Sequence, residues 1–416
     1  MRHLSTPFKA LAAIGCLAMV ASACGSSGDS GDSGDKGPIK LGAIVTISGP
    51  LAQIGQSHRA GAELAVKQIN EAGGVLGRQI QLDVKDEQVN PSASVQAARS
   101  FLGSDTKLLF GLTTDSDCLA VAPIVEQMGG VLVGTSCQSN LLETTKFVPS
   151  FFEIAPNNAM LAKATAALAS QKFPEVKSWD TVAPDYEYGH EVTKSYQDQL
   201  SEMDKDVSYR KDVFVPLTET QFNSHITSLL SGLPADSAKS TGLVMATFGA
   251  TTIGLAKQGK SFDMFNKYAT VINLGGSTPT AEALGADTPP MYFVYDYFDG
   301  AYDNATNTKF VEGFKQANDN ARPNAWAYEG YTAVLAYKAA IEKANSTDPA
   351  KVKEAMAGMT FDTPKGSLTF RAEDHLLQSP VTVWQVKPDS SAKEGFTVTT
   401  SDSIPADEVL PPVNVG

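Results

Sequence analysis

Two carboxylates in a polar segment are the first candidates for a chemical role. Asp115 and Asp117 lie two positions apart, and Thr113-Thr114 separates them from the apolar stretch 108–112. Paired carboxylates can act as general acid and base, and they also suit a cation or an ammonium group. Residues two apart in a loop have no fixed mutual geometry, and a carboxylate at a helix start can simply cap that helix. The pair therefore indicates binding or capping in preference to catalysis.

Other catalytic patterns fail in their context. Gly254, Gly259, Lys260 and Ser261 match a phosphate-binding loop by letter, but that loop needs its first glycine after a strand and its Lys-Ser at a helix start. Here Gly254 falls inside a predicted helix and Gly259 at its end. Residues 275–279 lack the final glycine of a nucleophile elbow. The five histidines have no metal-ligand spacing. We expect no enzyme, no cofactor and no metal.

Composition and charge narrow the class of protein. The 416 residues carry 33 Lys and Arg against 46 Asp and Glu, a net charge of −13, with 42% hydrophobic residues. Such a chain is globular and long enough for two or three domains. The acidic balance argues against a nucleic-acid partner, which needs a basic surface.

The N-terminus is typical of an exported lipoprotein. Arg2 and Lys9 precede the apolar run 11–20, and small residues lead to Cys24. This pattern predicts a signal peptide over 1–23, with Cys24 as the acylated first residue of the mature chain; the alternative is a plain signal peptide with an incidental cysteine. Residues 24–37 are rich in Gly, Ser and Asp and predict a flexible tether. We expect attachment to the outer face of the cell membrane.

Two further cysteines form a candidate pair. If Cys24 is acylated, Cys118 and Cys137 remain in an oxidising compartment, where a disulfide is the expected state. Two free buried thiols are the alternative.

Apolar spacing predicts alternating strands and helices. In the first half, alternation predicts strands near 39–47, 80–84, 108–110 and 131–133, and helical spacing or capping residues predict helices over 62–69, from 90 and over 119–127. A second series has strands near 181–183, 213–215, 243–247, 271–274 and 291–295, followed by a helix over 326–344 and antiparallel strands from 368. Such alternation predicts an α/β fold with parallel sheets covered on both faces.

In open parallel sheets, ligands bind beyond the carboxyl ends of the strands. The loops expected there are rich in glycine and hydroxyl residues, which suit an anionic or carbonyl group but also serve as ordinary helix caps. The five loops are 48–50, 113–117, 135–139, 248–251 and 275–278. Tyr186 and Tyr188 follow the first strand of the second series, where their rings either close over a ligand or are ordinary surface tyrosines. Together the loops predict one shared cleft.

Several motifs resemble one known family. The segment 48–55, the runs 65–70, 73–74 and 77–78, Asp86, Asn90-Pro91, Tyr188-Gly189 and 368–370 are similar to the branched-chain amino acid class of periplasmic solute-binding proteins of ABC transporters. The resemblance covers essentially the whole mature chain. It implies two doubly wound lobes joined by three crossovers near 155, 295 and 370. The first lobe would comprise 38–155 and 295–370, and the second 156–294 and 371–416.

The resemblance also implies a ligand site. Ser116 and Ser139 would hold a carboxylate, the backbone carbonyl near Cys137 would face an ammonium group, and Tyr188 would contact the ligand from the second lobe. The family often has an aromatic residue where this chain has Ile54. The acidic residue that pairs with the ammonium group should fall near Gly276 or Ser277, where none occurs. Either Asp115 or Asp117 replaces it, or the ligand lacks an amino group.

The function implied is capture of a small molecule, such as an amino acid, amide or carboxylate. A monomer would deliver it to an ABC permease and its ATPase subunits. The alternatives are a surface sensor of the same fold, coupled to a regulatory partner, and a surface hydrolase, for which no nucleophile–base pair can be assembled.

Overall fold

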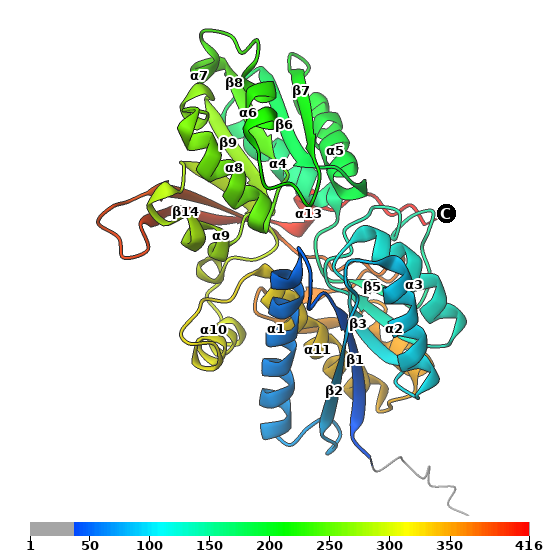
Figure 1. The fold of residues 1–416 in the computed structure, drawn as a ribbon. Coiled ribbons are helices and arrows are strands. Elements are labelled where there is room, and N and C mark those ends of the chain that lie inside the picture. Colours follow the sequence, from blue (N-terminus) through cyan, green and yellow to red (C-terminus); the bar gives the residue numbers. More distant parts are fainter. Residues whose placement is uncertain (1–36, 416) are drawn as a thin grey trace, which may run out of the picture. The chain divides into compact units, whose positions relative to one another are not determined.

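Two sheets built mainly from parallel strands organise the protein (Figure 1). The computed structural model describes residues 37–415. The predicted signal peptide, the acylated Cys24 and nearly all of the predicted tether lie outside these residues. The chain from Pro38 onward forms one compact unit.

The first sheet has the strand order β2-β1-β3-β4-β5 and is parallel throughout. Its strands are β1 (Ile39–Val45), β2 (Ile80–Asp86), β3 (Leu108–Gly111), β4 (Val131–Gly134) and β5 (Phe151–Glu153). Alternate residues of β1 enter two different cores, because Leu41 and Ala43 pack on one face of the sheet and Ile44 on the other. The sheet is therefore buried on both faces.

Helices from distant parts of the chain cover the first sheet. They are α1 (Ala52–Glu71), α2 (Pro91–Gly103), α3 (Asp115–Gln127), α11 (Ala325–Ala344) and α12 (Pro349–Met356). α1 packs against α11, and α2 against α3. A Cβ on Gly61 would lie 1.9 Å from the Ala327 carbonyl oxygen, and one on Gly330 would lie 2.0 Å from that of His58. Glycine at both positions lets α1 and α11 touch backbone to backbone.

The second sheet has the strand order β14-β13-β10-β9-β8-β6-β7. Its strands are β6 (Ser178–Pro184), β7 (Ser208–Val215), β8 (Thr241–Met245), β9 (Thr270–Leu274), β10 (Met291–Tyr295), β13 (Val381–Pro388) and β14 (Phe396–Ile404). The first five are parallel, whereas β13 pairs antiparallel with β10 and with β14. The predicted antiparallel ending is confirmed.

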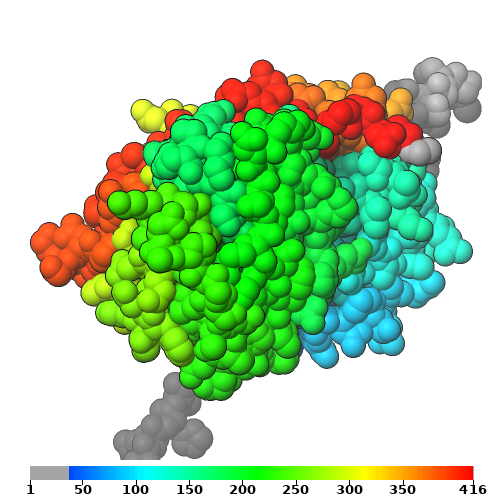
Figure 2. Space-filling model, turned by 90° about the horizontal axis from the view of Figure 1, so that it is seen from above, coloured from blue at the N-terminus to red at the C-terminus, as the bar shows by residue number. Residues whose placement is uncertain are grey.

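The helices of the second sheet are α4 (Asn158–Lys172), α5 (Glu187–Met203), α6 (Asn223–Leu230), α7 (Ser237–Ser240), α8 (Gly249–Ser261), α9 (Thr278–Leu284) and α13 (Ala406–Val409). α4 packs against α5, and α8 against both α6 and α9. Gly254 lies inside α8 and Lys260 lies in its last turn, so the phosphate-loop match has the wrong context. Figure 2 looks onto this part of the molecule, whose green segments occupy the centre of the view.

The sequence prediction missed four features between or beside the main series. They are the three-residue strand β5, the helix α10 (Ala305–Ala317), the helix α12, and the hairpin of β11 (Thr360–Thr363) with β12 (Gly366–Thr369). We call the first sheet with its helices the first lobe and the second sheet with its helices the second lobe. The residue bounds predicted for the two lobes stay a prediction.

The two sheets share one topology. β2-β1-β3-β4-β5 in the first lobe and β7-β6-β8-β9-β10 in the second have the same order of connection. In each, the chain leaves the first strand toward one edge and returns to start the next strand on the other side. Ligands of open α/β sheets bind at the carboxyl ends of the strands beside this change of direction. The fold therefore points to the ends of β1 and β3 and of β6 and β8.

Candidate functional site

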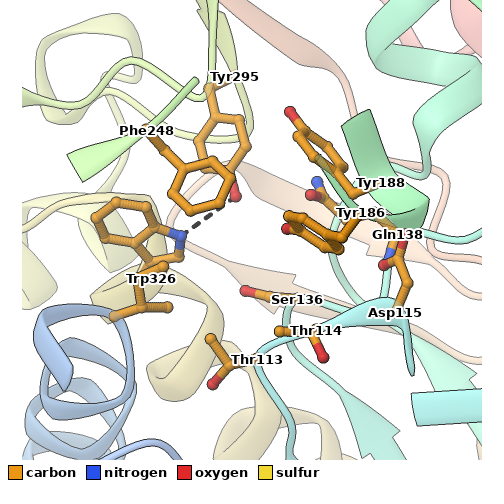
Figure 3. A pocket seen from close by; sticks show the side chains of 11 residues that line it. Thr113, Thr114, Asp115, Ser136, Gln138, Tyr186, Tyr188, Phe248, Tyr295 and Trp326 are labelled. Carbon is orange, nitrogen blue, oxygen red and sulfur yellow. Dashed lines mark hydrogen bonds between the residues drawn. The ribbon is translucent and has the colours of Figure 1, made fainter. Parts of the chain in front are cut away.

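A cavity lies where the carboxyl ends of both sheets meet (Figure 3). Its empty space is about 360 Å³, part of which is open to solvent. The lining residues from the first lobe are Ile54, Thr113, Thr114, Asp115, Ser136, Gln138 and Trp326, and those from the second sheet and its loops are Tyr186, Tyr188, Phe248 and Tyr295. Its place at the strand ends of both sheets is typical of a small-molecule site in α/β folds.

The polar floor of the cavity comes from the loops after β3 and β4. Thr114 is the N-cap of α3, and its Oγ1 accepts a hydrogen bond from the Asp117 backbone N–H at 3.3 Å. Asp117 itself turns inward, accepting hydrogen bonds from Ser94 Oγ (2.9 Å) and Thr114 Oγ1 (2.5 Å). Thr113 accepts a bond from Thr46 Oγ1 at 3.1 Å. Capping fixes Thr114 at the start of α3, the bond from Thr46 holds Thr113, and the bonds from Ser94 and Thr114 keep Asp117 out of the cavity.

A disulfide joins the two floor loops. Cys118 in the first turn of α3 is bonded to Cys137 in the loop after β4, and both are fully buried. The predicted pairing is present in the structure. It holds the segment that carries Asp115 against the segment that carries Ser136 and Gln138.

Among residues 37–415, Asp115 is the one carboxylate that lines the cavity. It is 2% exposed, and its oxygens accept hydrogen bonds from the Gln138 backbone N–H (2.8 Å) and from Asn158 Nδ2 (3.2 Å). Burial, and next the negative charge of Glu191, raise the pKa of Asp115 to about 7, although the bond from Gln138 opposes this. The group is therefore close to half ionised at neutral pH.

Aromatic rings form the opposite wall. Tyr186 is the N-cap of α5, and Tyr188 lies in its first turn. A Cβ on Gly189 would lie 1.9 Å from the Pro184 carbonyl oxygen, so glycine is needed for α5 to start so close to the end of β6. The Tyr186 and Tyr188 rings stack with centroids 5.9 Å apart, and Phe248 meets Tyr188 edge to face at 5.9 Å. The Oη of Tyr188 is buried and has no partner within residues 37–415.

Tyr295 and Trp326 complete the wall. Tyr295 ends β10, and Trp326 lies in the first turn of α11. Trp326 Nε1 donates a hydrogen bond to Tyr295 Oη at 3.2 Å, which links the two lobes across the cavity. The aromatic side chain that the family often has at position 54 is isoleucine here, and Trp326 lines the same cavity.

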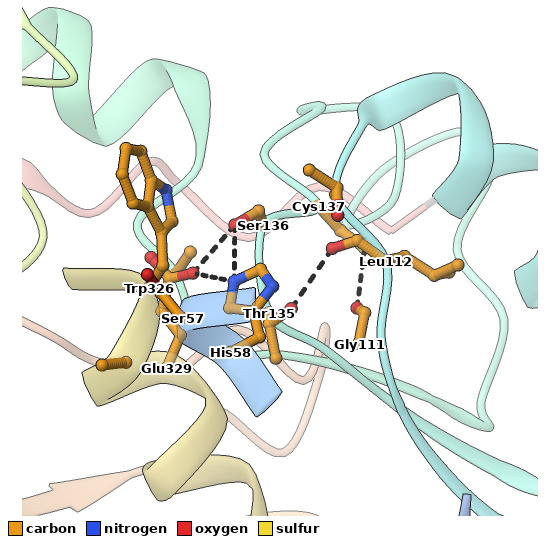
Figure 4. A network of polar contacts seen from close by, with 12 residues as sticks. Ser57, His58, Gly111, Leu112, Thr135, Ser136, Cys137, Trp326 and Glu329 are labelled. Atoms are coloured by element: carbon orange, nitrogen blue, oxygen red, sulfur yellow. Dashed lines mark hydrogen bonds and ion pairs between the residues drawn. The ribbon is translucent and has the colours of Figure 1, made fainter. Parts of the chain in front are cut away.

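A buried polar network supports the floor from below (Figure 4). Ser136 Oγ donates to Glu329 Oε2 at 2.8 Å, and His58 Nε2 lies 2.9 Å from the same oxygen. Burial lowers the pKa of His58 to about 3 and raises the pKa of Glu329 well above its usual value. Both shifts favour the uncharged form of the pair. The network ties α1, α11 and the loop after β4 together.

Polar contacts around the cavity also join the lobes. The Asn140 backbone N–H, in the first lobe, donates to Glu191 Oε1 on α5 at 3.0 Å. Ser116 Oγ lies 3.5 Å from Glu187 Oε2. These bonds exist only while α5 lies beside the first lobe's loops, so the structure shows a closed arrangement.

The predicted site residues separate into two groups. Ile54, Asp115 and Tyr188 line the cavity together. Ser116, Cys137, Ser139 and Ser277 are not among its lining residues; Ser139 Oγ accepts from the Leu141 backbone N–H, and Ser277 Oγ bonds Thr280 Oγ1. Their roles in ligand binding stay predictions.

Most of the remaining lining residues lie in the loops that the sequence had indicated, but two do not. Tyr295 and Trp326 were missed. The signal for Tyr295 is its place at the carboxyl end of a parallel strand. Trp326 had no such signal, because it belongs to a helix whose N-terminus reaches the cavity only through the packing of α11 on α1.

The only ionisable groups of the described cavity lining are acidic or phenolic. The lining has one carboxyl group and contains no lysine, arginine or histidine among the residues that the structure describes. Within the same part of the chain, no group of three or more His, Cys, Asp or Glu side chains is arranged to hold a metal ion. No helix between residues 37 and 415 is both long and apolar enough to span a bilayer.

The arrangement of two doubly wound lobes around a cavity agrees with comparison to known families. Residues 38–393 match the family model described as periplasmic binding protein, so the chain belongs to that family. It is an extracytoplasmic solute-binding protein of the kind that serves ABC transporters, and not an enzyme.

A curated relative agrees with this membership, and solved structures share the fold. The chain is 25% identical over 361 residues to the leucine-, isoleucine-, valine-, threonine- and alanine-binding protein of Pseudomonas aeruginosa, covering 86% of this chain and 92% of the relative. It superposes with a TM-score of 0.79 on an amino acid ABC transporter substrate-binding protein of Pseudomonas fluorescens (22% identical, 90% and 97% covered). A solute-binding protein of Rhodopseudomonas palustris in complex with 3,4-dihydroxybenzoic acid also gives 0.79 (18% identical, 90% and 99% covered).

Proposed function

We propose that this chain is a lipid-anchored receptor that encloses a small polar molecule between its lobes and delivers it to an ABC importer. The main support for this proposal is the cavity, which is lined by strand-end loops of both sheets. A ligand there contacts both lobes only when they are closed, so binding favours the closed form. The permease then reads the closed shape.

The chemistry of the lining supports binding without reaction. Threonine, serine and glutamine side chains supply hydrogen bonds, and five aromatic rings supply apolar surface. The Ser136 hydroxyl lies 3.2 Å from His58 Nε2, but it donates its hydrogen to Glu329 Oε2 at 2.8 Å, and burial lowers the pKa of His58 to about 3, which makes this imidazole a poor base. The ligand class we propose is a branched-chain or other amino acid, or a related amide or carboxylate, in line with the relatives named for leucine, isoleucine and valine.

A thermal-shift screen of amino acids, amides, ureas and small carboxylates tests the proposal. A ligand at 100 times its Kd adds about 2.7 kcal/mol to the free energy of unfolding. Trp326 fluorescence provides a second signal, because the indole lines the cavity whereas Trp179 and Trp384 are buried elsewhere. A stabilising ligand that leaves Trp326 emission unchanged would place binding outside this cavity.

Measuring ligand uptake by cells distinguishes a receptor that delivers the ligand to an importer from a surface sensor. Cells that lack this chain should lose high-affinity uptake of the ligand found in the screen, and the wild-type gene should restore it. Unchanged uptake together with an altered transcriptional response to the ligand would favour the sensor.

A further inference from the structure

A second cavity lies where the chain crosses between the two lobes, and we call it the hinge cavity. Its empty space is about 260 Å³, part of which is open to solvent, and it shares no lining residue with the cavity of Figure 3. Four segments line it: the loop after β4, the start of α4, the connection between β12 and β13, and Pro411 and Pro412 after α13. Figure 1 shows this last, red segment running from α13 toward the C-terminus.

We propose that the hinge cavity is a second binding site, which takes a small primary ammonium group against Glu143 and thereby favours the closed form of the protein. This site is distinct from the capture of a ligand between the strand ends. Its support comes from an unsatisfied buried carboxyl oxygen, from the charges of the lining and from the position of the cavity between the lobes.

Glu143 supplies the binding atom. Its side chain is 2% exposed, and Oε2 accepts a hydrogen bond from Asn157 Nδ2 at 3.2 Å, whereas Oε1 has no partner within residues 37–415. The amide oxygens of the lining are already used, because Asn157 Oδ1 accepts from the Met160 backbone N–H (3.0 Å) and Asn140 Oδ1 from that of Ala159 (2.8 Å). A buried oxygen without a partner costs free energy that a ligand's N–H can recover.

The charges of the hinge cavity favour a cation. Arg371 is the one basic residue of the described lining, and Asp374 pairs with it at two points, through Nε (2.8 Å) and Nη2. The third nitrogen of Arg371, Nη1, donates to the Pro411 carbonyl at 2.7 Å. The groups that interact electrostatically with Glu143 are all acidic: Asp115, Glu153 and Asp374. An ionised Glu143 therefore leaves one negative charge in the lining that an ammonium group would balance.

The ionisation of Glu143 gives this binding a pH dependence. Burial raises the pKa of Glu143 to about 8; the bond from Asn157 opposes this shift, and the charge of Asp374 adds to it. An ammonium group that binds the carboxylate must displace the proton below this pH. Its affinity should therefore rise by about tenfold per pH unit up to pH 8 and stay constant above it.

Occupation of the hinge cavity should be coupled to closure. Glu143 belongs to the first lobe and Asn157 directly precedes α4 of the second, so the walls move relative to each other when the lobes rotate. The cavity described here has the shape of the closed arrangement, and a cation that fits this shape stabilises it. A ligand between the strand ends stabilises the same form. By linkage, each then raises the affinity of the other by the same factor.

Three chloride salts at equal concentration test the site in the full mature protein. Methylammonium carries a charge and N–H donors, tetramethylammonium carries the charge alone, and sodium controls for ionic strength. Methylammonium should raise the Tm more than the other two cations, and the difference should grow from pH 6 to pH 8. Equal shifts with all three salts would show that the hinge cavity holds water only, and would overturn the proposal.

A pair of matched variants tests the residue. Glu143→Gln keeps the shape of the side chain but removes its charge, and should abolish the specific effect of methylammonium. The control is Glu153→Gln, because Glu153 is also fully buried with one oxygen lacking a partner in the described chain, but lies outside the lining of the hinge cavity. This variant should keep the methylammonium effect. Equal loss in both variants would contradict the assignment to Glu143.

Calorimetry with the ligand found in the screen tests the coupling. Methylammonium at saturation should raise the affinity for that ligand by about fivefold, and the ligand should raise the affinity for methylammonium equally. A ligand affinity that falls as methylammonium is added would place methylammonium between the strand ends and overturn the proposal. If the screen finds no ligand, the proposed function fails, whereas the salts and the Glu143 variant still decide whether the hinge cavity binds a cation.

Discussion

At the scale of single residues, the site combines side chains held firmly by the fold with one that lacks a partner. Thr114 is committed to capping α3, and Ser136 to Glu329. Tyr188 is 3% exposed, and its hydroxyl has no hydrogen-bond partner in the described part of the chain. A buried polar group without a partner costs free energy that a ligand can recover. Tyr188 is thus poised to bond a ligand.

Removing the Tyr188 hydroxyl should change ligand affinity without lowering the stability of the ligand-free protein. Tyr188→Phe should weaken ligand affinity by about fivefold, because one hydrogen bond of about 1 kcal/mol is lost. The Tm without ligand should stay equal or rise, since the hydroxyl has no partner to lose. Isothermal titration calorimetry and thermal unfolding measure the two effects.

The control is Tyr196→Phe. The Tyr196 hydroxyl is also buried without a partner, but it lies outside the cavity lining. This variant should leave affinity unchanged. Equal loss of affinity in both variants would show that Tyr188 acts on packing of α5 and not on the ligand.

The sequence predicts site residues where local rules suffice. Asp115 and Tyr188 follow strands in polar loops, and strand ends are where such folds bind ligands. Ile54 came from the resemblance of the first loop. The position of Trp326 in the cavity depends on how α11 crosses α1 at Gly61 and Gly330. That crossing is a tertiary property, which residue spacing does not predict.

At the scale of elements, the disulfide between α3 and the loop after β4 stabilises the cavity floor. The crosslink closes a loop of 19 residues in sequence separation. Cys118→Ala combined with Cys137→Ala should lower the free energy of unfolding by about 3 kcal/mol in the chain-entropy model. Urea denaturation of the oxidised, reduced and double-variant proteins measures it. Identical stability of oxidised and reduced wild type would contradict the predicted contribution.

A second feature at this scale is a buried lysine beside the two points where the chain leaves the second sheet, after β10, and returns to it, before β13. Lys365 lies in the turn between β11 and β12, and its Nζ donates to Asp296 Oδ1 (2.6 Å), the Asp296 carbonyl (2.9 Å) and the Pro380 carbonyl (2.6 Å). Asp296 directly follows β10, and Pro380 directly precedes β13. One ammonium group therefore ties together both connections beside the second sheet.

Removing the lysine should leave a buried carboxyl group without its partner. Lys365→Met should cost about 3–5 kcal/mol of stability by chemical denaturation. The double variant Lys365→Met with Asp296→Asn should recover part of that loss, because it no longer buries an unpaired charge. A single variant as stable as wild type would show that the ion pair contributes nothing.

Helices and strands were predicted from the sequence where their hydrophobic pattern is long and regular. The strands of both series alternate or form apolar runs, and α11 extends over 20 residues, so each gave a clear signal. β5 has three residues, too few for periodicity to show. The hairpin β11–β12 has two four-residue strands and was likewise missed, except for its end near Leu368.

At the scale of the whole molecule, buried carboxyl groups give stability a characteristic pH dependence. Burial raises the pKa of Glu87 and of Glu143 to about 8 and that of Asp115 to about 7. Between pH 5 and pH 8 these three groups bind more protons in the folded protein than in the unfolded chain, so they make stability fall as pH rises. His58, whose pKa burial lowers to about 3, opposes this below pH 6.5, but it is one group against three.

This sign predicts a higher Tm at pH 5 than at pH 8 for the ligand-free protein. Glu143→Gln should reduce the slope, because the neutral amide mimics the protonated group. Differential scanning calorimetry at a series of pH values measures it. A Tm that rises from pH 5 to pH 8 would contradict the raised pKa values.

Attachment to the membrane is also a property of the whole molecule. Cys24→Ser should move the protein from the membrane fraction to the soluble extracytoplasmic fraction, because no thiol remains to be acylated. Cys16→Ser, inside the apolar run of the predicted signal, should leave the protein membrane-bound. Membrane retention of the Cys24 variant would count against the lipid anchor.

The central claim is that a guest molecule is trapped, unchanged, between the two lobes. A crystal structure with the ligand from the screen tests this most directly. The account predicts the intact compound in the cavity, in contact with Asp115 from the first lobe and with Tyr188 from the second. A compound bound to one lobe alone, or recovered in altered form, would contradict it.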